Sequence, residues 1–400
     1  MIEILEENRE ILSRYRLKGF SYLGGLLVET GNAIELKGVT KRFGDVIAND
    51  NVNLTVRKGE ILSILGENGS GKTTLMNMLS GIYFPDEGEV YVDGKEVTIR
   101  SPKDSFALGI GMIHQHFKLI NILTAAENII LGLPGKEKLN MKQVEKEIRE
   151  LTEQYGFDLN PSQKIYDMSV SQKQTVEIVK VLYRGADILI LDEPTAVLTP
   201  QETEKLFAVL RNMRKAGKSI IIITHKLNEV LELSDRVAVL RKGKYIDTVE
   251  TAKATVESLT EMMVGEKVKL DINRTEPVGA EKRIEMRGIT CRNKEGLKVL
   301  TEASFTAYSG EILGVAGISG SGQKELLESV AGLQPIESGE ILYFSPEGTT
   351  EKISEMKAED IKNLGITLSF VPEDRLGMGL VGSMDLTDNM MIRSYRNGKG

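Results

Sequence analysis

A glycine-rich loop between an apolar run and a helix-compatible run constrains this chain more than any other feature of its sequence. Residues 66–73 read Gly-Glu-Asn-Gly-Ser-Gly-Lys-Thr, directly after the apolar run Glu60–Leu65 and before the run Thr74–Leu79. The glycines let successive backbone N–H groups turn toward a phosphate, and the following helix adds the positive end of its dipole. Strand, loop and helix together predict an α/β fold with a phosphate-binding site.

The pattern of this loop also predicts roles for its side chains. Lys72 would reach the β- and γ-phosphates of a nucleotide, and the Thr73 hydroxyl would hold Mg²⁺. The expected nucleotide-binding residues of the loop are Gly66, Glu67, Asn68, Gly69, Ser70, Gly71, Lys72, Thr73 and Thr74.

Two further short apolar runs, Ile188–Leu191 and Ser219–Ile223, alternate with helix-period stretches such as Val144–Tyr155 and Glu202–Lys215. Nearly continuous apolar runs of this length predict buried parallel strands. Ligands bind at the carboxyl ends of the strands in open α/β sheets. The polar residues that follow these runs are therefore candidates for the chemistry.

Asp192, Glu193 and His225 are those polar residues. Asp192 suits Mg²⁺ binding through water, and Glu193 suits orienting or deprotonating the attacking water. A single histidine is more often structural than functional. Because His225 lies at a third strand end, we expect it to contact a γ-phosphate.

The sequence also repeats itself at an offset of 250 or 251 residues. Three short matches on one diagonal predict a tandem duplication of a module of about 250 residues, with the second copy cut short. The matched pairs are Glu35–Thr40 with Glu285–Thr290, Gly59–Leu62 with Gly310–Leu313, and Gly88–Tyr91 with Gly339–Leu342.

This repeat sets the expected domain boundaries. We expect one complete domain and one truncated domain, joined by a linker of mixed charge. The expected parts are an N-terminal extension at 1–31, a first domain at 32–265 with a helical subdomain at about 117–183, a linker at 266–282, and a second domain at 283–400.

Composition and charge exclude several classes of function. The 51 basic and 58 acidic side chains give a net charge of −7, which argues against binding to a nucleic-acid backbone. The single cysteine, Cys291, cannot form an internal disulfide and fits a reducing compartment. No apolar run approaches the roughly 18–20 residues that span a bilayer, so a membrane role would need a partner.

These elements, in this order, resemble the ATP-binding cassette (ABC) family over nearly all of residues 32–400. The resemblance implies two tandem P-loop ATPase modules, each with a mixed-sheet core and an inserted helical subdomain, the second degenerate and truncated. It makes residues 66–73 the Walker A loop, Asp192 and Glu193 the Walker B pair, and His225 the switch histidine. ATP and Mg²⁺ are the implied ligands, and Lys72, Glu193 and His225 belong to the implied catalytic set.

The same resemblance implies roles for four residues outside these strand ends. Phe43 would stack on adenine, Gln115 would act in catalysis and in Mg²⁺ binding, and Ser169 and Gln172 would contact nucleotide as part of the signature. Alone, Phe43 is more typical of a core aromatic and Gln115 of a surface amide. His114 and His116 flank Gln115, but no cysteine or further histidine lies nearby in the sequence to complete a metal site.

Two departures from the family pattern concern the contacts to nucleotide. Residues 168–172 read Met-Ser-Val-Ser-Gln instead of Leu-Ser-Gly-Gly-Gln, so side chains obstruct a close backbone approach to phosphate. In the second copy, Gln323 stands at the position of Lys72 and Lys324 at that of Thr73, and Glu373 at that of Gln115.

Modules of this family dimerise head to tail, so both departures would fall in one composite site. The intact loop would then pair with a signature beyond Gly400. We therefore expect the chain to bind Mg-ATP at residues 66–73 without the partner half of its working site.

The duplication, the altered second loop and the Pro-Glu-Asp-Arg stretch at 372–375 resemble the simple-sugar and nucleoside importers. Residues 114–117 and 322–325 resemble the nucleoside members more than the ribose or galactose members. The resemblance implies a motor subunit on the cytoplasmic face of the membrane that couples ATP hydrolysis to nucleoside or simple-sugar uptake. Its partners would be integral-membrane permeases and, indirectly, an extracellular substrate-binding lipoprotein, with no nucleic acid. Residues 117–133 would either contact the permease or form part of the core of the helical subdomain.

Two other functions stay open at this point. A soluble twin-cassette ATPase acting on ribosomes or nucleic acid is the first, although residues 251–282 carry five basic and six acidic side chains and no basic linker. An inactive fragment or regulatory remnant is the second.

Overall fold

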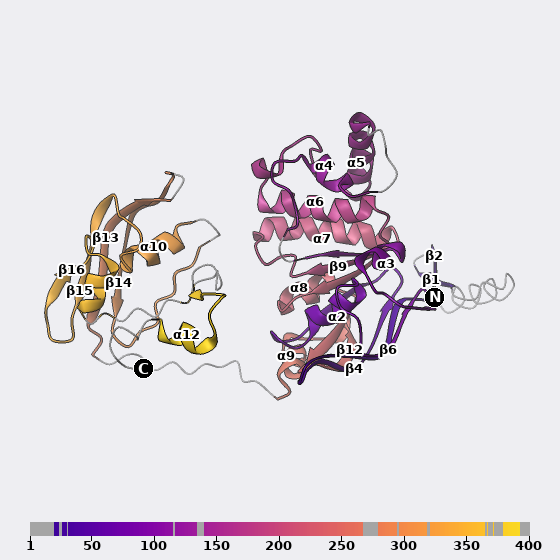
Figure 1. Ribbon diagram of the computed structural model, residues 1–400, viewed down its shortest axis with the longest axis horizontal. Helices are drawn as coiled ribbons and strands as arrows, with labels where there is room; N and C mark the ends of the chain where they lie inside the picture. The colour runs from indigo at the N-terminus through magenta and orange to yellow at the C-terminus, as the bar shows by residue number, and fades with distance from the viewer. Residues whose placement is uncertain are drawn as a thin grey trace. The chain divides into compact units, whose positions relative to one another are not determined.

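A computed structural model gives the fold of the 400-residue chain, which its internal contacts divide into two units, Met1–Ile272 and Asn273–Gly400. Each unit is described by itself (Figure 1). The structure describes residues 20–23, 26–29, 31–114, 117–133, 140–266, 279–293, 296–317, 321–364, 366, 371 and 379–392.

A six-stranded mixed sheet forms the centre of the first unit. Its strand order is β12-β11-β5-β10-β9-β8; all neighbours are parallel except β11 and β12. Every residue of β5, β9 and β10 is buried. This burial and the strand pairing confirm the predicted buried parallel strands and the mixed sheet. The strands are β5 (Ile61–Leu65), β8 (Ile110–Ile113), β9 (Ile188–Asp192), β10 (Ser219–Ile223), β11 (Arg236–Arg241) and β12 (Lys244–Glu250).

A four-stranded antiparallel sheet of order β4-β3-β6-β7 accompanies the central sheet. Helix α2 (Lys72–Leu79) shares a core with strands of both sheets, through buried residues that include Leu36, Leu62 and Met76. This packing places the start of α2 against β4. The strands are β3 (Asn32–Phe43), β4 (Val46–Arg57), β6 (Glu87–Val92) and β7 (Lys95–Val97).

Local sequence explains where the longer helices start. Helix α7 begins after Thr199, whose hydroxyl accepts from Glu202 N, with Pro200 at its first position. Helix α5 begins after Asn140 and ends at Gly156, which adopts left-handed φ. Both helices contain the predicted helical stretches. The other helices around the central sheet are α3 (Pro102–Ala107), α8 (Leu227–Leu233), α9 (Val256–Val264) and the 3₁₀ turn η2 (Thr251–Lys253).

Helices α4, α5 and α6 gather at one end of the first unit, beside α7 (Figure 1). They have a separate core of residues such as Ile129, Ile148 and Val176. The other face of α6 packs into the core with α7 through Ile178 and Leu182, so α6 joins the two parts. The elements here are α4 (Ala125–Ile130), α5 (Met141–Tyr155), the 3₁₀ turn η1 (Ile165–Asp167), α6 (Val170–Tyr183) and α7 (Pro200–Lys215).

The second unit repeats the antiparallel part of the first. Its sheet order β14-β13-β15-β16 matches β4-β3-β6-β7, and α10 follows the second loop as α2 follows the first. Its elements are β13 (Lys282–Arg292), β14 (Lys298–Tyr308), α10 (Gln323–Val330), β15 (Ser338–Phe344), β16 (Thr350–Lys352), α11 (Ala358–Asn363) and α12 (Leu386–Met391).

One segment differs between the copies. Residues 311–317, which correspond to β5, form no strand, and Ile312 is fully exposed. Strand β5 is buried because it pairs with β10 and β11 on its two sides. The described part of the second unit contains no such neighbours for residues 311–317.

Two strands, β1 (Phe20–Leu23) and β2 (Leu26–Glu29), form an antiparallel hairpin within the expected extension at 1–31. Across the residues that the structure describes, no helix has both the length and the apolar character that crossing a membrane requires.

Candidate functional site

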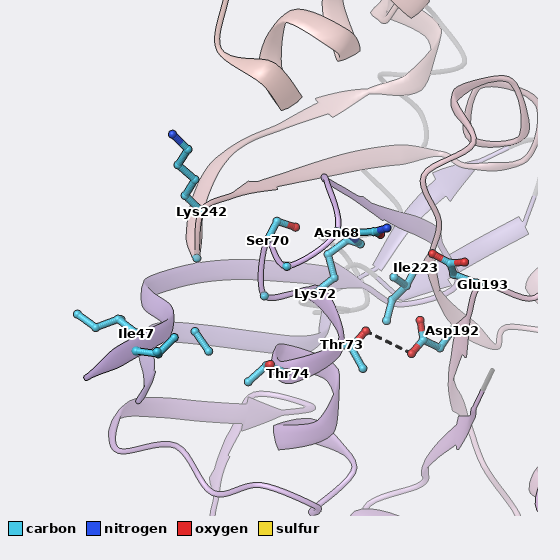
Figure 2. Close-up of a pocket in the computed structure, with 15 residues that line it drawn as sticks. Ile47, Asn68, Ser70, Lys72, Thr73, Thr74, Asp192, Glu193, Ile223 and Lys242 are labelled. Atoms are coloured by element: carbon cyan, nitrogen blue, oxygen red, sulfur yellow. Dashed lines mark hydrogen bonds between the residues drawn. The ribbon is translucent and has the colours of Figure 1, made fainter. Parts of the chain in front are cut away.

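A cavity of about 560 Å³ lies where β5 and β9 of the central sheet end (Figure 2). The phosphate loop forms one wall, and the end of β9 forms another. The lining residues are Val46, Ile47, Ala48, Asn68, Gly69, Ser70, Gly71, Lys72, Thr73, Thr74, Asp192, Glu193, Ile223, Lys242 and Gly243.

Glycine is required at two positions of this loop by the backbone that surrounds it. A Cβ atom on Gly66 would lie 2.2 Å from the Leu240 carbonyl oxygen, and one on Gly71 would lie 2.3 Å from that of Ala48. Gly71 also has a φ of +95°, which favours glycine. The loop therefore keeps its tight turn only with glycine at these two positions.

Lys72 brings its charge to the inside of the loop. Its Nζ donates to the carbonyl oxygens of Gly66 at 2.7 Å and Glu67 at 2.8 Å. Burial lowers the pKa of Lys72, while the charges of Glu193, Asp192 and Glu67 oppose that shift. An ammonium group held in this way suits the binding of a phosphate at the start of α2.

The donors of Thr73 and Asp192 fit a magnesium ion. Thr73 Oγ1 lies 3.4 Å from Asp192 Oδ2 across the cavity (Figure 2). Both are oxygen donors, and Mg²⁺ is usually held by one or two carboxylates together with phosphates and waters. Burial and, next, the charge of Glu193 raise the pKa of Asp192, against the effects of the Thr73 hydrogen bond and Lys72. A bound cation would offset this accumulation of negative charge.

Asp192→Asn should stabilise the nucleotide-free protein at neutral pH and remove the Mg²⁺ dependence of nucleotide binding. Since the folded-state pKa of Asp192 is raised, the folded protein holds this proton more tightly than the unfolded chain. The ionised carboxylate therefore lowers stability above the folded-state pKa, and this cost disappears as the pH falls. Thermal unfolding across a pH series should show a gain for the variant that shrinks toward acid pH.

Nucleotide titrations with and without MgCl₂ complete this test. A variant that is less stable than the parent at neutral pH, or that keeps the full Mg²⁺ dependence, would contradict the assignment of Asp192.

Glu193 sits in a backbone turn that several groups hold in place. Its φ is +48°, an uncommon left-handed value for a residue other than glycine. Its N–H donates to the Ile223 carbonyl at 2.9 Å, and Gln174 Nε2 on α6 donates to the next carbonyl, that of Pro194, at 2.6 Å. His225 Nδ1 lies 2.9 Å from Glu193 Oε1. Glu193 thus lines the same cavity as Lys72 (Figure 2).

The structure brings together most of the residues expected from sequence. Asn68–Thr74, Asp192 and Glu193 line the cavity, Gly66 and Glu67 bind Lys72, and His225 contacts Glu193.

Three expected residues lie elsewhere. Phe43, at the end of β3, is 43% exposed and meets Tyr83 edge-on with ring centroids 5.1 Å apart. Ser169 and Gln172 bond to each other in a capping box that starts α6. These three are absent from the described lining of the cavity. Gln115 lies outside the described residues, as does the stretch 372–375.

Sequence reasoning missed two segments that form part of the cavity. Val46, Ile47 and Ala48 begin β4, and Lys242 and Gly243 form the turn between β11 and β12. Gly243 N donates to the Ser70 carbonyl at 3.2 Å, which fixes this turn against the loop. No local motif marks either segment, because only the sheet pairing brings them to the loop.

The second loop has a different internal contact. Gln323, at the position of Lys72, donates from Nε2 to the Val315 carbonyl at 2.9 Å. A neutral amide provides no charge for a phosphate.

Comparisons with known proteins show the family of this chain. A profile of the ABC transporter family matches residues 49–196. The nucleoside import ATP-binding protein NupA of Lactococcus lactis is 45% identical, over 90% of this chain and 71% of that protein. The guanosine import ATP-binding protein NupO of Bacillus subtilis is 43% identical, over 90% of this chain and 70% of that protein.

A more distant relative and a solved structure also match the chain. The ribose import ATP-binding protein RbsA 1 of Rubrobacter xylanophilus is 38% identical, over 90% of this chain and 70% of that protein. A crystal structure of a nucleotide-free ATP-binding cassette from an ABC transporter has a TM-score of 0.51 and 26% identity, covering 59% of this chain and 96% of that one. The chain therefore belongs to the ABC transporter family and is one of its ATP-binding, ATP-hydrolysing subunits.

Proposed function

We propose that this subunit binds Mg-ATP at the cavity and uses its hydrolysis to drive the import of a nucleoside through partner permeases. The observation that carries the proposal is the convergence of Lys72, Thr73, Asp192 and Glu193 on one cavity. Nucleoside is proposed ahead of simple sugar because the nucleoside and guanosine import proteins are 45% and 43% identical to the chain, against 38% for the ribose import protein.

Five side chains of the site have proposed roles. Lys72 and the N–H groups at the start of α2 hold the β- and γ-phosphates, and Thr73 and Asp192 hold Mg²⁺. The ion, when bound, neutralises charge that develops on the phosphate oxygens. Glu193 orients and polarises the attacking water, and His225 keeps that carboxylate in place through its 2.9 Å contact.

A patch on the helical part is the proposed permease contact. Ile122 is 72% exposed, Tyr166 is 61% exposed and Ile120 is 42% exposed. Tyr166 N donates to the Asn121 carbonyl at 3.2 Å, so the two segments lie side by side. Exposed apolar residues gathered in this way are typical of protein contacts. Leu119 and Ile129 of the same stretch pack inward, so residues 117–133 contribute to both the surface and the core.

The remaining assignments follow from this role. We propose that the subunit works at the cytoplasmic face of the membrane and that an extracellular binding lipoprotein delivers the cargo to the permeases. We also propose domains at 32–265 and 283–400, with Phe43 near the adenine and with Gln115, Ser169 and Gln172 acting once the modules close.

The test compares two variants at equivalent loop positions in cells that depend on this importer for nucleoside uptake. Lys72→Ala should abolish uptake of labelled nucleoside and weaken Mg-ATP binding by about tenfold or more, because a charge-assisted contact to phosphate is lost. Gln323→Ala, at the corresponding position of the second copy, should leave both unchanged. Nucleoside uptake that survives Lys72→Ala, or a loss of ribose uptake instead, would contradict the proposal.

A further inference from the structure

A buried amide lies directly behind the phosphate loop. Asn49 on β4 has no exposed surface, and its Nδ2 donates to the Gly71 carbonyl at 3.2 Å. The same carbonyl accepts the first helical hydrogen bond of α2, from Leu75 N at 2.9 Å. Asn49 therefore binds the peptide at which the loop becomes the helix.

The other polar atom of this amide has no partner. Asn49 Oδ1 is buried without a hydrogen bond to any residue that the structure describes. An unpartnered buried acceptor lowers stability, and an apolar side chain of similar shape avoids that cost. Stability alone would therefore favour leucine here, so the amide requires another explanation.

The second unit shows what replaces the amide. Gly322 corresponds to Gly71: both precede the helix, with φ of +91° and +95°. A Cβ atom on Gly71 would meet Asn49 Nδ2 at 2.7 Å, and one on Gly322 would meet Leu300 Cδ2 at 2.7 Å. Leu300 thus occupies the place of Asn49.

The replacement coincides with the change in the loop itself. The copy with Leu300 is the one in which Gln323 stands at the position of Lys72 and Lys324 at that of Thr73. The amide accompanies the intact phosphate motif, and leucine accompanies the altered one. This pairing within one chain connects Asn49 with phosphate binding and not with the fold that both copies share.

We propose that Asn49 is a positioning residue of the phosphate loop, which holds the Gly71–Lys72 peptide so that the Lys72 N–H points at a bound phosphate. In a planar trans peptide the C=O and N–H point in opposite directions. Asn49 binds the carbonyl from outside the cavity that Gly71 and Lys72 line, so the N–H is directed inward. A hydrogen bond to the carbonyl also polarises the peptide and strengthens its N–H as a donor.

This inference rests on the proposed binding of ATP at the loop, and Asn49→Leu tests it. The substitution should weaken Mg-ADP binding by about three- to tenfold, the effect of one neutral hydrogen bond. It should also leave the midpoint of thermal unfolding of the nucleotide-free chain unchanged or raised, since it removes the unpartnered Oδ1. Both are measured on the full chain, by calorimetric titration and by thermal unfolding.

The converse substitution, Leu300→Asn, is the matched control. It should lower the stability of the second unit and leave the affinity for Mg-ADP unchanged, because the second loop lacks the lysine and threonine.

The outcomes separate this inference from the proposed function. A folded wild-type chain that does not bind Mg-ADP overturns the proposed function. A wild-type chain that binds, with Asn49→Leu binding equally well, overturns the role of Asn49 alone. If Asn49→Leu lowers stability together with affinity, Asn49 is merely structural and the inference also fails.

Discussion

Glu193→Gln is expected to lower kcat for ATP hydrolysis by about 10²–10⁴-fold while Mg-ATP still binds. Glutamine keeps the size of the side chain and can keep the contact to His225, which lies 2.9 Å from the carboxylate. It cannot accept a proton from water, and it carries no charge to polarise one. The loss should therefore fall on the chemical step and not on binding.

Phosphate release under saturating ATP measures the first effect, and equilibrium titration with Mg-ATP measures the second. Glu204→Gln, an exposed residue of α7, makes the same chemical change away from the cavity and should leave both unchanged. A Glu193→Gln variant that hydrolyses ATP at the parent rate would exclude this residue as the group that activates water.

Arg236→Met is expected to lower the free energy of unfolding by about 3–5 kcal/mol, because it leaves a buried carboxylate without its partner. Arg236 Nη1 at the start of β11 lies 3.2 Å from Glu60 Oε1, next to β5, and both side chains are about nine-tenths buried. Burial raises the pKa of Glu60 even with Arg236 and Arg57 opposing it. Removing Arg236 alone therefore lowers stability, because the charge of Glu60 stays buried without the charge that opposes it.

Urea denaturation of the full chain measures this loss. Glu60→Gln combined with Arg236→Met should recover most of it, since no charge then stays buried. The loss in the single variant should shrink as the pH falls, because the raised folded-state pKa of Glu60 means that the folded protein takes up the proton first.

Arg211→Met is the matched control for this experiment. It breaks an exposed ion pair in which Arg211 Nη2 lies 3.1 Å from Glu232 Oε1. This change should lower the free energy of unfolding by about 0–1 kcal/mol. Equal losses for Arg211→Met and Arg236→Met would show that burial of the pair has no special effect.

Much of the fold and of the site was accessible from sequence because its signals are local. The apolar runs at β5, β9 and β10 are each buried throughout, so they read as strands without knowledge of their neighbours. The loop 66–73 has a pattern whose chemistry is local as well. The ends of the elements were less accurate: Glu60 precedes β5, and β9 extends one residue beyond the predicted run, to Asp192.

Contacts between distant segments could not be predicted in this way. Asn49 is 22 residues from Gly71 and has no motif, yet its amide binds the Gly71 carbonyl. Gln174 binds the turn after Glu193 from another helix. These contacts depend on how strands and helices pair, which no short stretch of sequence specifies.

The repeated segments Gly59–Leu62 and Gly310–Leu313 show most clearly what the sequence determined and what the tertiary structure determined. The sequence by itself determined the phosphate loop, the order of the strand ends and the duplication, because each can be recognised from short stretches of residues without knowledge of how the chain folds. Only the tertiary structure decided that residues 61–65 are a buried strand while residues 311–317 are exposed and form none. The physical reason is that a strand in the middle of a sheet is buried only where partners on both sides satisfy its backbone hydrogen bonds. Strands β10 and β11 supply these partners to β5, and the described residues of the second unit supply none to residues 311–317.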